Sequence, residues 1–496
     1  MQRLLRRGDR HREAAHRLSP KVMTMDLQAP SPAAPAPADA GTTDNGITDN
    51  GITDNGITDN GITDDRIADS GIADTDAPAI ETPGIETAGI DPPRAETAAD
   101  RPRLRERHFD VADKRVRVLL GEDVRDEMVA TLGGLGADRF IVVTDDNVAD
   151  VAAGKLADAL DAVAPALLLS HPPGEEHKNL ATLSRFIDLA LDFGATRKTV
   201  VVAVGGGIPG NIAGLLAGLL FRGVRLVHVP TTVIAACDSV ISVKQAVNTS
   251  HAKNMVGLYH RPELILVDLA VVALGSPRDL RSGTCETVKN ALAIEPSQIP
   301  RLRELLRPRA DYTPADLGEI FDLSLAVKSR LLLEDPYEKY SGLLLEYGHT
   351  IGHALELAST AHGPKEAALK HGEAVALGML AAADVARRMG LLDDADVAVH
   401  EELIDRVGVC RCLTAGIASK TVLHHIAFDN KRGYRACDDD EVAMVLLSAL
   451  GKPLGADEHY LTPVPHAHVA AAVHDLLRRG GECAGAARGT EGHTVS

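Results

Sequence analysis

Five short apolar segments, four of them rich in β-branched residues, alternate with helical patterns and constrain the fold of this chain more than any other feature. They are RFIVVTD, PALLLSH, TVVVAVGGG, VRLVHVPTT and ELILVD, between residues 139 and 268. Strands joined through helices pair in parallel, because each crossover returns the chain to the same end of the sheet. We therefore predict an α/β domain with a doubly wound parallel sheet over residues 106–275, which begins with a hairpin formed by FDVAD and RVRVLLG.

The pattern changes after residue 275. Strand signals nearly vanish from Ser276 onward, and amphipathic helical patterns continue to about Leu477, with one predicted hairpin at EVAMVLLSALGKP. We predict a mainly α-helical domain over residues 276–478. The remaining residues, 479–496, are small and polar, and we predict a flexible tail.

The first hundred residues have a different composition. A five-residue repeat, TDNGI, runs from Thr43 to Ile62 among many Pro, Ala, Asp and Glu residues. Such a segment buries too little apolar surface to offset its chain entropy. We predict that residues 1–105 form a disordered extension.

Charge and composition exclude several classes of partner. The net charge of −18 argues against a nucleic-acid partner, because phosphate backbones are held by a surplus of Lys and Arg. No segment reaches the roughly 20 apolar residues of a membrane span. The six cysteines show no CxxC pair and no disulfide framework, which indicates free thiols in a reducing cytoplasm.

A glycine-rich loop, GGGIPGNIAG, follows the strand that ends at Val204. Glycines let the backbone approach a pyrophosphate, and the N-terminus of the next helix offers unpaired N–H groups, although a tight turn without a ligand would also use glycine. Polar residues follow the other strands, where a dinucleotide is held in an α/β sheet. These candidates are Asp145, Asn147, Glu175, Lys178, Thr231 and Thr232.

Carboxylate and imidazole side chains recur at helical spacing in the second half. Glu286, Lys289 and Asn290 in RSGTCETVKNALAI project from one helical face, His349 and His353 lie one turn apart in GHTIGHALE, and His371 follows in KHGEAVALGM. One Glu and two His form a zinc set that keeps a position open for a substrate. We choose Glu286, His349 and His371, leave His353 for phosphate binding or proton transfer, and keep His362 as the alternative third ligand.

Together these motifs resemble the sugar-phosphate cyclases, the family that includes dehydroquinate synthase. The resemblance covers roughly residues 108–470, and within the family the chain is similar to the inosose synthases of aminoglycoside producers. The stretches that carry it are GGGIPGNIAGLLAGLLFRG, HVPTTVIAACDSVISVKQAVN, KNMVGLYHRPELILVD, SGTCETVKNALAI, EYGHTIGHALE and FDNKRGY.

The resemblance implies a set of roles. Zn²⁺ or Co²⁺ would be held by Glu286, His349 and His371, and Lys244 and Glu346 would be the catalytic pair, with a lowered pKa for Lys244 beside the metal and the nicotinamide. Substrate or its phosphate would contact Arg222, Lys289, His353 and Lys431, and the protein would be a homodimer. NAD would be bound by Asp145, Asn147, Glu175, Lys178, Gly207, Asn211, Thr231, Thr232, Asp238, Lys244, Lys253 and Asn254.

Two departures from dehydroquinate synthase bear on the substrate. Ser242, Val243 and Lys244 stand where that enzyme has GGK, and Glu346 stands where it has Asn. In addition, its arginine for the substrate carboxylate falls near Gly342 here. A site without that arginine fits glucose 6-phosphate, which would undergo oxidation by NAD at C4, phosphate elimination, reduction and aldol ring closure. The alternatives are dehydroquinate synthase itself, an epi-valiolone-type cyclase, a metal-dependent alcohol dehydrogenase and an inactive paralogue.

Overall fold

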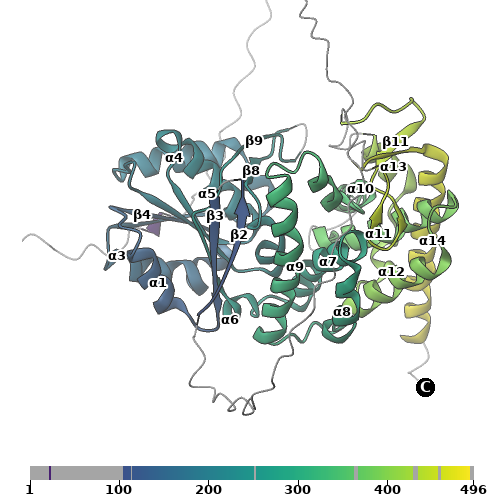
Figure 1. Cartoon of the computed structure of the whole chain (residues 1–496), viewed down its shortest axis with the longest axis horizontal. Coiled ribbons are helices and arrows are strands. Elements are labelled where there is room, and N and C mark those ends of the chain that lie inside the picture. Colours follow the sequence, from purple (N-terminus) through teal and green to yellow (C-terminus); the bar gives the residue numbers. More distant parts are fainter. Residues whose placement is uncertain are drawn as a thin grey trace, which may run out of the picture. The chain divides into compact units, whose positions relative to one another are not determined.

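An eight-stranded sheet organises the first half of the computed structural model (Figure 1), with the strand order β1-β5-β4-β6-β7-β10-β3-β2. The five predicted strands pair in parallel and occupy its centre. The predicted hairpin is also confirmed, as β2 (Leu104–Val111) against β3 (Lys114–Gly121). The five central strands are β4 (Phe140–Asp145), β5 (Ala166–His171), β6 (Val200–Gly205), β7 (Arg225–Pro230) and β10 (Leu264–Asp268).

The structure describes residues 22–23, 104–112, 114–250, 253–361, 367–427, 434–455 and 460–491. Most of the predicted extension over residues 1–105, including the TDNGI repeats, lies outside these residues. Within it, the two-residue strand β1 (Val22–Met23) pairs in parallel with β5, which we did not predict.

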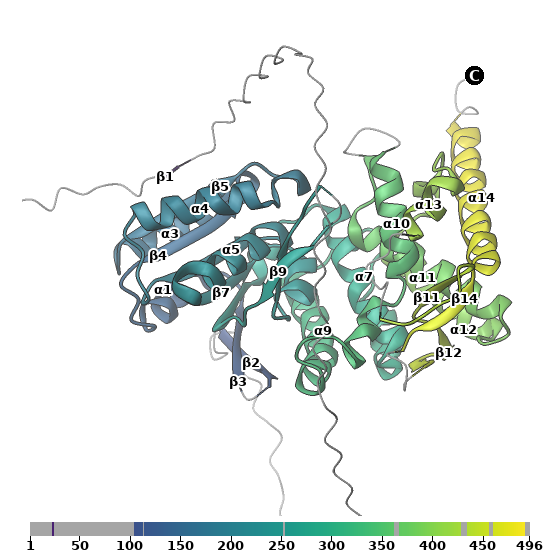
Figure 2. The same cartoon turned by 90° about the horizontal axis from the view of Figure 1, so that it is seen from above.

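Helices cover both faces of the central sheet, which confirms the doubly wound α/β fold (Figure 2). Helices α1 (Arg125–Gly133) and α3 (Gly154–Asp161) pack on one face, and α4 (Leu180–Asp192) and α5 (Gly207–Leu219) pack on the other. Because both faces are buried, the central strands are apolar throughout rather than alternating. Strands β4 and β6 are neighbours, and the chain moves outward from them in opposite directions, so ligands are expected at their carboxyl ends.

A second hairpin lies beside α5 and was missed by the sequence patterns. It consists of β8 (Lys244–Val247) and β9 (Val256–Tyr259), paired in antiparallel fashion. Oδ1 of Asn211 in α5 accepts the backbone N–H of Ala246 at 2.8 Å and holds the hairpin in place. Lys244 is therefore the first residue of a strand.

The second half is mainly helical, as predicted. Helix α11 (His371–Arg388) is almost entirely buried, and its small and apolar residues pack against α7 (Pro277–Ala293) and α10 (His349–Thr360). None of the described helices is long and apolar enough to cross a membrane. The helices after β10 are α6 (Leu269–Val272), α7 (Pro277–Ala293), α8 (Ile299–Leu305), α9 (Pro314–Glu334), α10 (His349–Thr360), α11 (His371–Arg388), α12 (Asp394–Val407), α13 (Ser419–Ile426) and α14 (His466–Glu491).

The predicted hairpin at EVAMVLLSALGKP is only partly correct. Strands β12 (Leu447–Ala449) and β13 (Lys452–Pro453) form a short hairpin, but β11 (Glu441–Met444) pairs with β14 (Thr462–Pro465). The segment therefore contributes to two small sheets.

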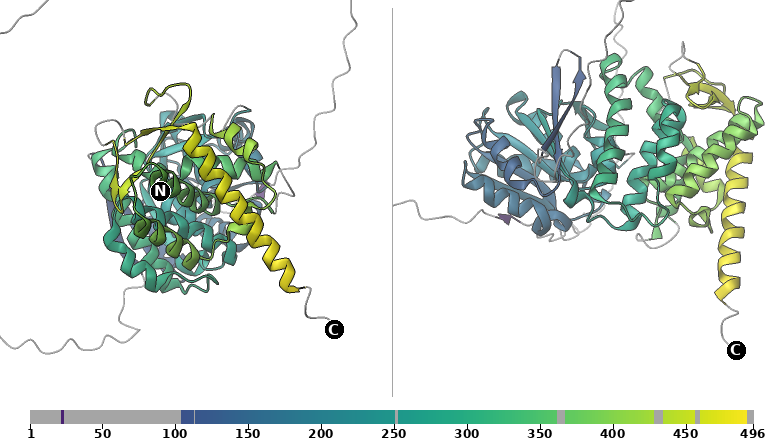
Figure 3. Two further views of the ribbon diagram at one scale, coloured as in Figure 1. Left: turned by 90° about the vertical axis from the view of Figure 1, so that its right-hand side faces the viewer. Right: turned by 60° about the horizontal axis from the view of Figure 1, so that its bottom comes forward.

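The C-terminal helix α14 also differs from expectation (Figure 3). The tail predicted from residue 479 is helical as far as Glu491. Part of this helix packs against the rest of the domain. A Cβ at Gly480 would overlap Oγ1 of Thr414, so α14 lies directly against the short helix η8 (Arg411–Thr414). Cys410 and Cys412 beside η8 form a disulfide, with Cα atoms 5.2 Å apart, and the prediction of free thiols is wrong for this pair.

Candidate active site

Three helices bring the predicted metal ligands together. Glu286 lies within α7, His349 begins α10 and His371 begins α11. Oε1 of Glu286 lies 3.8 Å from Nε2 of His349 and 3.5 Å from Nε2 of His371. That oxygen is buried and finds no hydrogen-bond partner among the described residues. An orphaned carboxylate oxygen that faces two imidazole nitrogens fits a divalent metal ion.

The other ring nitrogen of each histidine has an acceptor. Nδ1 of His349 donates to the carbonyl oxygen of Tyr347 at 3.2 Å, and Nδ1 of His371 donates to Oε2 of Glu356 at 3.2 Å. Such partners fix the tautomer and orientation of metal-binding histidines and leave Nε2 for the ion. Glu356 was not predicted, although its spacing of seven from His349 places both on one face of α10 and could have indicated it.

The charges of this cluster suit a cation. Burial lowers the pKa of His349 to about 4, so its imidazole is neutral at neutral pH. Burial would also lower the pKa of His371, but Glu286 and Glu356 outweigh burial and raise that pKa to about 10, so a metal ion bound at Nε2 takes the place of the proton there. Burial would raise the pKa of Glu286, but Lys289 and the two histidines hold it well below its usual value. The carboxylate is thus ionised, as metal binding requires.

His353 lies beside the same point. Its ring centroid is 5.0 Å from that of His349 and 5.6 Å from that of His371. The ligand nitrogens of the three histidines lie within 4.8 Å of one another, so they are an alternative ligand set to the one with Glu286. We favour Glu286 because it is the more deeply buried group and its oxygen lacks a partner among the residues described.

Gly348 fixes the start of α10. Its φ is +78°, and a Cβ there would lie 2.6 Å from Cγ and 2.9 Å from the backbone N of Met379 in α11. Only glycine fits this conformation and this close approach without displacement. The turn therefore sets the position of His349 relative to the preceding residue pair Glu346 and Tyr347.

Helix α7 buries a second set of polar groups next to Glu286. Nζ of Lys289 donates to Oε2 of Glu286 at 2.5 Å, and Lys289 and Asn290 are each 1% exposed. Oδ1 of Asn290 is buried without a hydrogen-bond partner in the described part of the chain. A buried ammonium group and an unpaired amide oxygen beside the metal position are suited to a polar, anionic ligand.

Lys244 is paired with a residue that the sequence did not indicate. Its Nζ donates to Oε2 of Glu338 at 2.8 Å, and Oγ of Ser242 donates to Oε1 of the same carboxylate at 2.9 Å. Burial would lower the pKa of Lys244, but Glu338 outweighs burial and the pKa is raised. The expected lowered pKa is therefore wrong, and Lys244 is an ammonium group at neutral pH.

The backbone around Glu338 depends on a glycine. Glu338 adopts a positive φ of +52°, and its side chain is buried. A Cβ at Gly342 would lie 2.6 Å from Cβ of Glu338 and 3.1 Å from Oδ2 of Asp335. Any side chain at position 342 would displace Glu338, so the site has no room there for an arginine.

Glu346 ends the short helix η6 (Ser341–Glu346), three residues before His349. Its negative charge helps to raise the pKa values of both Lys244 and Lys289 and acts on His349. The structure therefore brings the predicted pair, Lys244 and Glu346, to the side of the metal cluster.

The glycine loop lies at the carboxyl end of β6, as predicted. Helix α5 begins at Gly207, and the N-cap residue before it, Gly206, provides no side-chain cap. Thr231 follows β7, and its hydroxyl is buried without a partner among the residues that the structure describes. A 13-residue helix with an uncapped N-terminus beside an orphaned hydroxyl fits a phosphate-containing cofactor. A cavity of about 440 Å³ at the ends of β6, β7 and β10 reaches Thr231 and Asp268.

Several predicted nucleotide residues form one hydrogen-bond network. Nζ of Lys178 donates to Oδ1 of Asn254 at 2.5 Å, and Oε1 of Glu175 accepts Nδ2 of Asn248 at 2.8 Å. The backbone N–H of Asn254 donates to Oδ1 of Asn248 at 2.8 Å. Asn248 was not predicted, and it joins the segment after β5 to the turn before β9.

Other members of the predicted set have local roles. The Asp145 side chain accepts the N–H of Asn147 at 3.0 Å and caps the short helix α2 (Asp146–Val148), and Oγ1 of Thr232 accepts the N–H of Ala235 at 3.2 Å. Oδ1 of Asp238 accepts Nζ of Lys328 in α9 at 2.7 Å.

Lys253 links the hairpin to the metal cluster. Its Nζ donates to Oε1 of Glu356 at 2.8 Å, and the other oxygen of Glu356 holds His371. The Glu356 carboxylate therefore contacts both a predicted NAD-binding residue, Lys253, and a predicted metal ligand, His371.

Three predicted residues are not brought to this cluster within the described chain. Arg222 lies beyond the C-terminal end of α5, about 18 Å along the helix from Gly207. Phe221 and Arg222 have positive φ values of 53° and 66° and turn the chain toward β7, which carries Arg222 away from the glycine loop. Lys431 and His362 lie outside the described residues.

Comparison with known proteins agrees with this geometry. The family models for the N-terminal and C-terminal parts of 3-dehydroquinate synthase match residues 168–282 and 283–432. The chain is 49% identical over 358 residues to the 2-deoxy-scyllo-inosose synthase of Streptoalloteichus tenebrarius, covering 72% of this chain and 91% of that protein. It is 46% identical to the enzyme of that name from Streptomyces kanamyceticus, covering 72% and 90%.

A solved structure shares both fold and sequence with this chain. It is a 2-deoxy-scyllo-inosose synthase complexed with carbaglucose-6-phosphate, NAD⁺ and Co²⁺, with 37% identity and a TM-score of 0.70. The match covers 75% of this chain and 100% of that one.

Proposed function

The chain belongs to the 3-dehydroquinate synthase family of sugar-phosphate cyclases, and from that premise we propose that it converts D-glucose 6-phosphate to 2-deoxy-scyllo-inosose and inorganic phosphate. In this proposal it is a carbon–oxygen lyase of aminoglycoside biosynthesis that eliminates phosphate and then closes a carbocycle. The observation that carries the substrate assignment is the contact between Gly342 and Glu338. Where dehydroquinate synthase has an arginine for a substrate carboxylate, the space is filled by the side chains of Glu338 and Asp335.

The proposal includes two cofactors. NAD would be held at the carboxyl ends of β4, β6 and β7, and Zn²⁺ or Co²⁺ would be held by Glu286, His349 and His371. The orphaned oxygens of Glu286 and Thr231 support these positions. When bound, NAD supplies reversible hydride acceptance at C4 of the sugar, and the metal supplies a Lewis acid for the C4 oxygen.

The side chains of this chain then carry the proton transfers. Glu346 takes the proton from C5 of the oxidised sugar, which allows phosphate to leave from C6. Lys244 stays an ammonium group and donates hydrogen bonds to the reacting hydroxyl oxygens, with Glu338 holding its Nζ in place. Lys289, buried beside Glu286, binds a negatively charged part of the substrate.

The proposal extends to the setting of the enzyme. We propose that it acts in the cytoplasm, as the cysteine usage indicates, and as a homodimer, as the resemblance to the family implies. Light scattering coupled to size-exclusion chromatography tests the dimer, and a monomer mass would contradict it.

Phosphate release from defined substrates tests the reaction. The purified chain is incubated with NAD and Zn²⁺ or Co²⁺, separately with glucose 6-phosphate, sedoheptulose 7-phosphate and the heptulosonate precursor of dehydroquinate. We expect phosphate from glucose 6-phosphate only, together with a cyclic product of the mass of 2-deoxy-scyllo-inosose. Release from the heptulosonate alone would indicate dehydroquinate synthase. Release from none of them by metal-loaded protein would favour a dehydrogenase or an inactive paralogue.

A further inference from the structure

A cluster of three sulfur atoms lies away from the proposed active site. Cys410 and Cys412 flank Arg411 at the start of η8, and Cys483 lies on α14. The ligand atoms of the three cysteines lie within 4.8 Å of one another. Sγ of Cys410 is 3.6 Å from Sγ of Cys483, although the two residues are separated by 73 positions. The cluster shares no residue with the Glu286 site.

The distance between Sγ of Cys410 and Sγ of Cys483 is that of two ligands on one metal ion. With metal–sulfur bonds of about 2.3 Å and tetrahedral angles, two thiolates on Zn²⁺ lie about 3.8 Å apart. The distance between Cys410 and Cys483 is close to this value. Cys412 is now bonded to Cys410, and it becomes a third ligand when that disulfide opens.

Close packing of the backbone holds the cluster together. A Cβ at Gly480 would overlap Oγ1 of Thr414 and would lie 2.5 Å from the carbonyl oxygen of Arg411. The α14 backbone therefore approaches η8 as closely as a glycine permits, and Cys483 is placed three residues later, one turn along the helix. Because the sulfurs are positioned by the fold, little ordering is needed when an ion binds.

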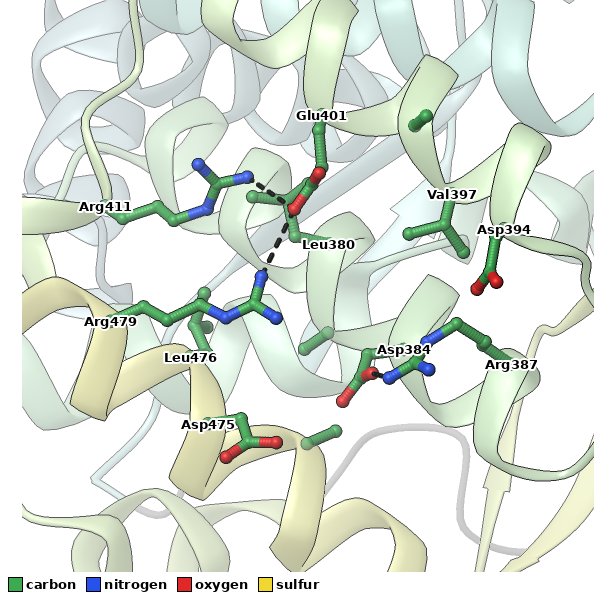
Figure 4. Close-up of a pocket in the computed structure, with 13 residues that line it drawn as sticks. Leu380, Asp384, Arg387, Asp394, Val397, Glu401, Arg411, Asp475, Leu476 and Arg479 are labelled. Carbon is green, nitrogen blue, oxygen red and sulfur yellow. Dashed lines mark hydrogen bonds and ion pairs between the residues drawn. The ribbon is translucent and has the colours of Figure 1, made fainter.

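The charges around the cluster favour an anionic metal–thiolate centre. Three thiolates on a divalent cation leave one net negative charge. Arg411 lies between two of the cysteines, and Arg479 lies four residues before Cys483 on α14. Figure 4 shows both guanidinium groups converging on Glu401 of α12, at 3.0 and 3.2 Å. Two cations that belong to residues within four positions of the cysteines thus share one carboxylate.

We propose that Cys410, Cys412 and Cys483 form a redox-gated binding site for a thiophilic divalent cation such as Zn²⁺, which ties α14 to η8. A dithiol reductant supplies two electrons and two protons, so the Cys410–Cys412 disulfide becomes two thiols and the dithiol becomes a disulfide. The cation then binds three thiolates and releases three protons to water. In the disulfide form the site lacks two of its ligands and does not bind.

Cobalt absorption tests the site, because a cobalt–sulfur bond absorbs in the near ultraviolet and the Glu286 site has no sulfur ligand. The intact protein is reduced with a phosphine, which adds no competing thiol, and titrated with Co²⁺. We expect two equivalents of Co²⁺ per chain and a charge-transfer band. Cys483→Ser should lose the band and one equivalent, whereas Cys437→Ser, a free cysteine outside the cluster, should retain both.

Oxidation state and helix dynamics provide further outcomes. The unreduced protein should bind one equivalent of Co²⁺ fewer than the reduced protein and should not show the band. In the reduced chain, Zn²⁺ should slow amide hydrogen exchange around Cys483, and this effect should be absent in Cys483→Ser. A reduced chain that binds Co²⁺ without the band, or a band that survives Cys483→Ser, would overturn the proposal. The same band in the unreduced protein would overturn the redox gating. These readouts do not depend on turnover, so they stand apart from the proposed cyclase activity.

Discussion

Nζ of Lys244 donates to Oε2 of Glu338 at 2.8 Å, across 94 positions of sequence. The second oxygen of the same carboxylate accepts Oγ of Ser242, which also accepts the backbone N–H of Lys244 at 3.1 Å. Lys244 is thus held through both its side chain and its backbone. A lysine held in this way can keep its charge and its direction while the substrate changes.

Glu338→Gln should lower activity and shift its pH dependence. The raised pKa of Lys244 means that its ammonium form persists to higher pH than for a free lysine, and the ion pair is lost only as pH rises through that raised value. Without the carboxylate, burial dominates and the pKa falls. We expect the alkaline limb of kcat/KM to move to lower pH, with a loss of at least about tenfold near neutrality, the size of a lost hydrogen bond to a charged group.

Ser242→Ala is the matched comparison for that variant. It removes the hydrogen bond that the neutral Ser242 hydroxyl donates to Glu338 and keeps the charge of the Glu338 carboxylate. It should therefore reduce kcat less than Glu338→Gln does and leave the alkaline limb nearly in place. An unchanged pH profile in Glu338→Gln would show that Glu338 does not control Lys244.

Gly342→Ala should disturb the same carboxylate from its other side. The new Cβ would lie 2.6 Å from Cβ of Glu338, so Glu338 or the η6 backbone must shift. Overpacking of this kind costs about 1–3 kcal/mol, and we expect a lower melting temperature together with lower kcat. Gly481→Ala is the control, because its Cβ would meet nothing within 4 Å in α14. It should leave activity unchanged and stabilise the helix by up to about 1 kcal/mol. Equal effects of the two substitutions would contradict the role of Gly342.

Glu356→Gln should weaken metal binding without removing a ligand. Glu356 holds Nδ1 of His371 at 3.2 Å, and loss of such a partner typically lowers metal affinity about 10–100-fold. Competition with a chromophoric chelator measures this affinity. Lys253→Ala removes the other partner of Glu356 and should raise the Kd for NAD more than it changes the metal affinity. Unaltered metal affinity in Glu356→Gln would mean that His371 is oriented by other contacts.

Much of the architecture could be predicted because it rests on local patterns. The five central strands are buried on both faces, so each one is a continuous apolar segment. Such a segment predicts a strand from its own sequence alone. The proposed metal ligands lie on amphipathic helices, where Glu286 and Lys289 at i and i+3 interrupt an otherwise apolar pattern. Both kinds of signal lie within a few residues along the chain.

The parts that were missed depend on distant contacts. Glu338 lies in a turn without periodic pattern, and its importance comes from a positive φ, from Gly342 and from Lys244 in another strand. The hairpin of β8 and β9 is short, and α5 holds it by a side-chain bond from Asn211. The helical end of α14 is rich in glycine, and its packing against η8 is a tertiary contact that outweighs weak helix propensity.

Glu346→Gln separates catalysis from metal binding. Glu346 lies three residues before His349 and is not one of the proposed metal ligands, so the variant should retain its metal. Gln has nearly the same shape and cannot accept the C5 proton, and general-base catalysis contributes about 10²–10⁴-fold. We expect phosphate release to fall by that factor while metal content and NAD affinity stay unchanged.

Lys244→Ala makes the complementary test, because Lys244 donates hydrogen bonds and does not take the C5 proton. Exchange of the C5 hydrogen with deuterium from solvent should therefore persist at a reduced rate in Lys244→Ala and vanish in Glu346→Gln. Loss of metal from either variant would mean that the ligand assignment is wrong. Exchange that survives in Glu346→Gln would mean that another group removes the C5 proton. His353 would then be the first candidate, because its ring centroid lies 5.0 Å from that of His349 and it is not one of the proposed ligands.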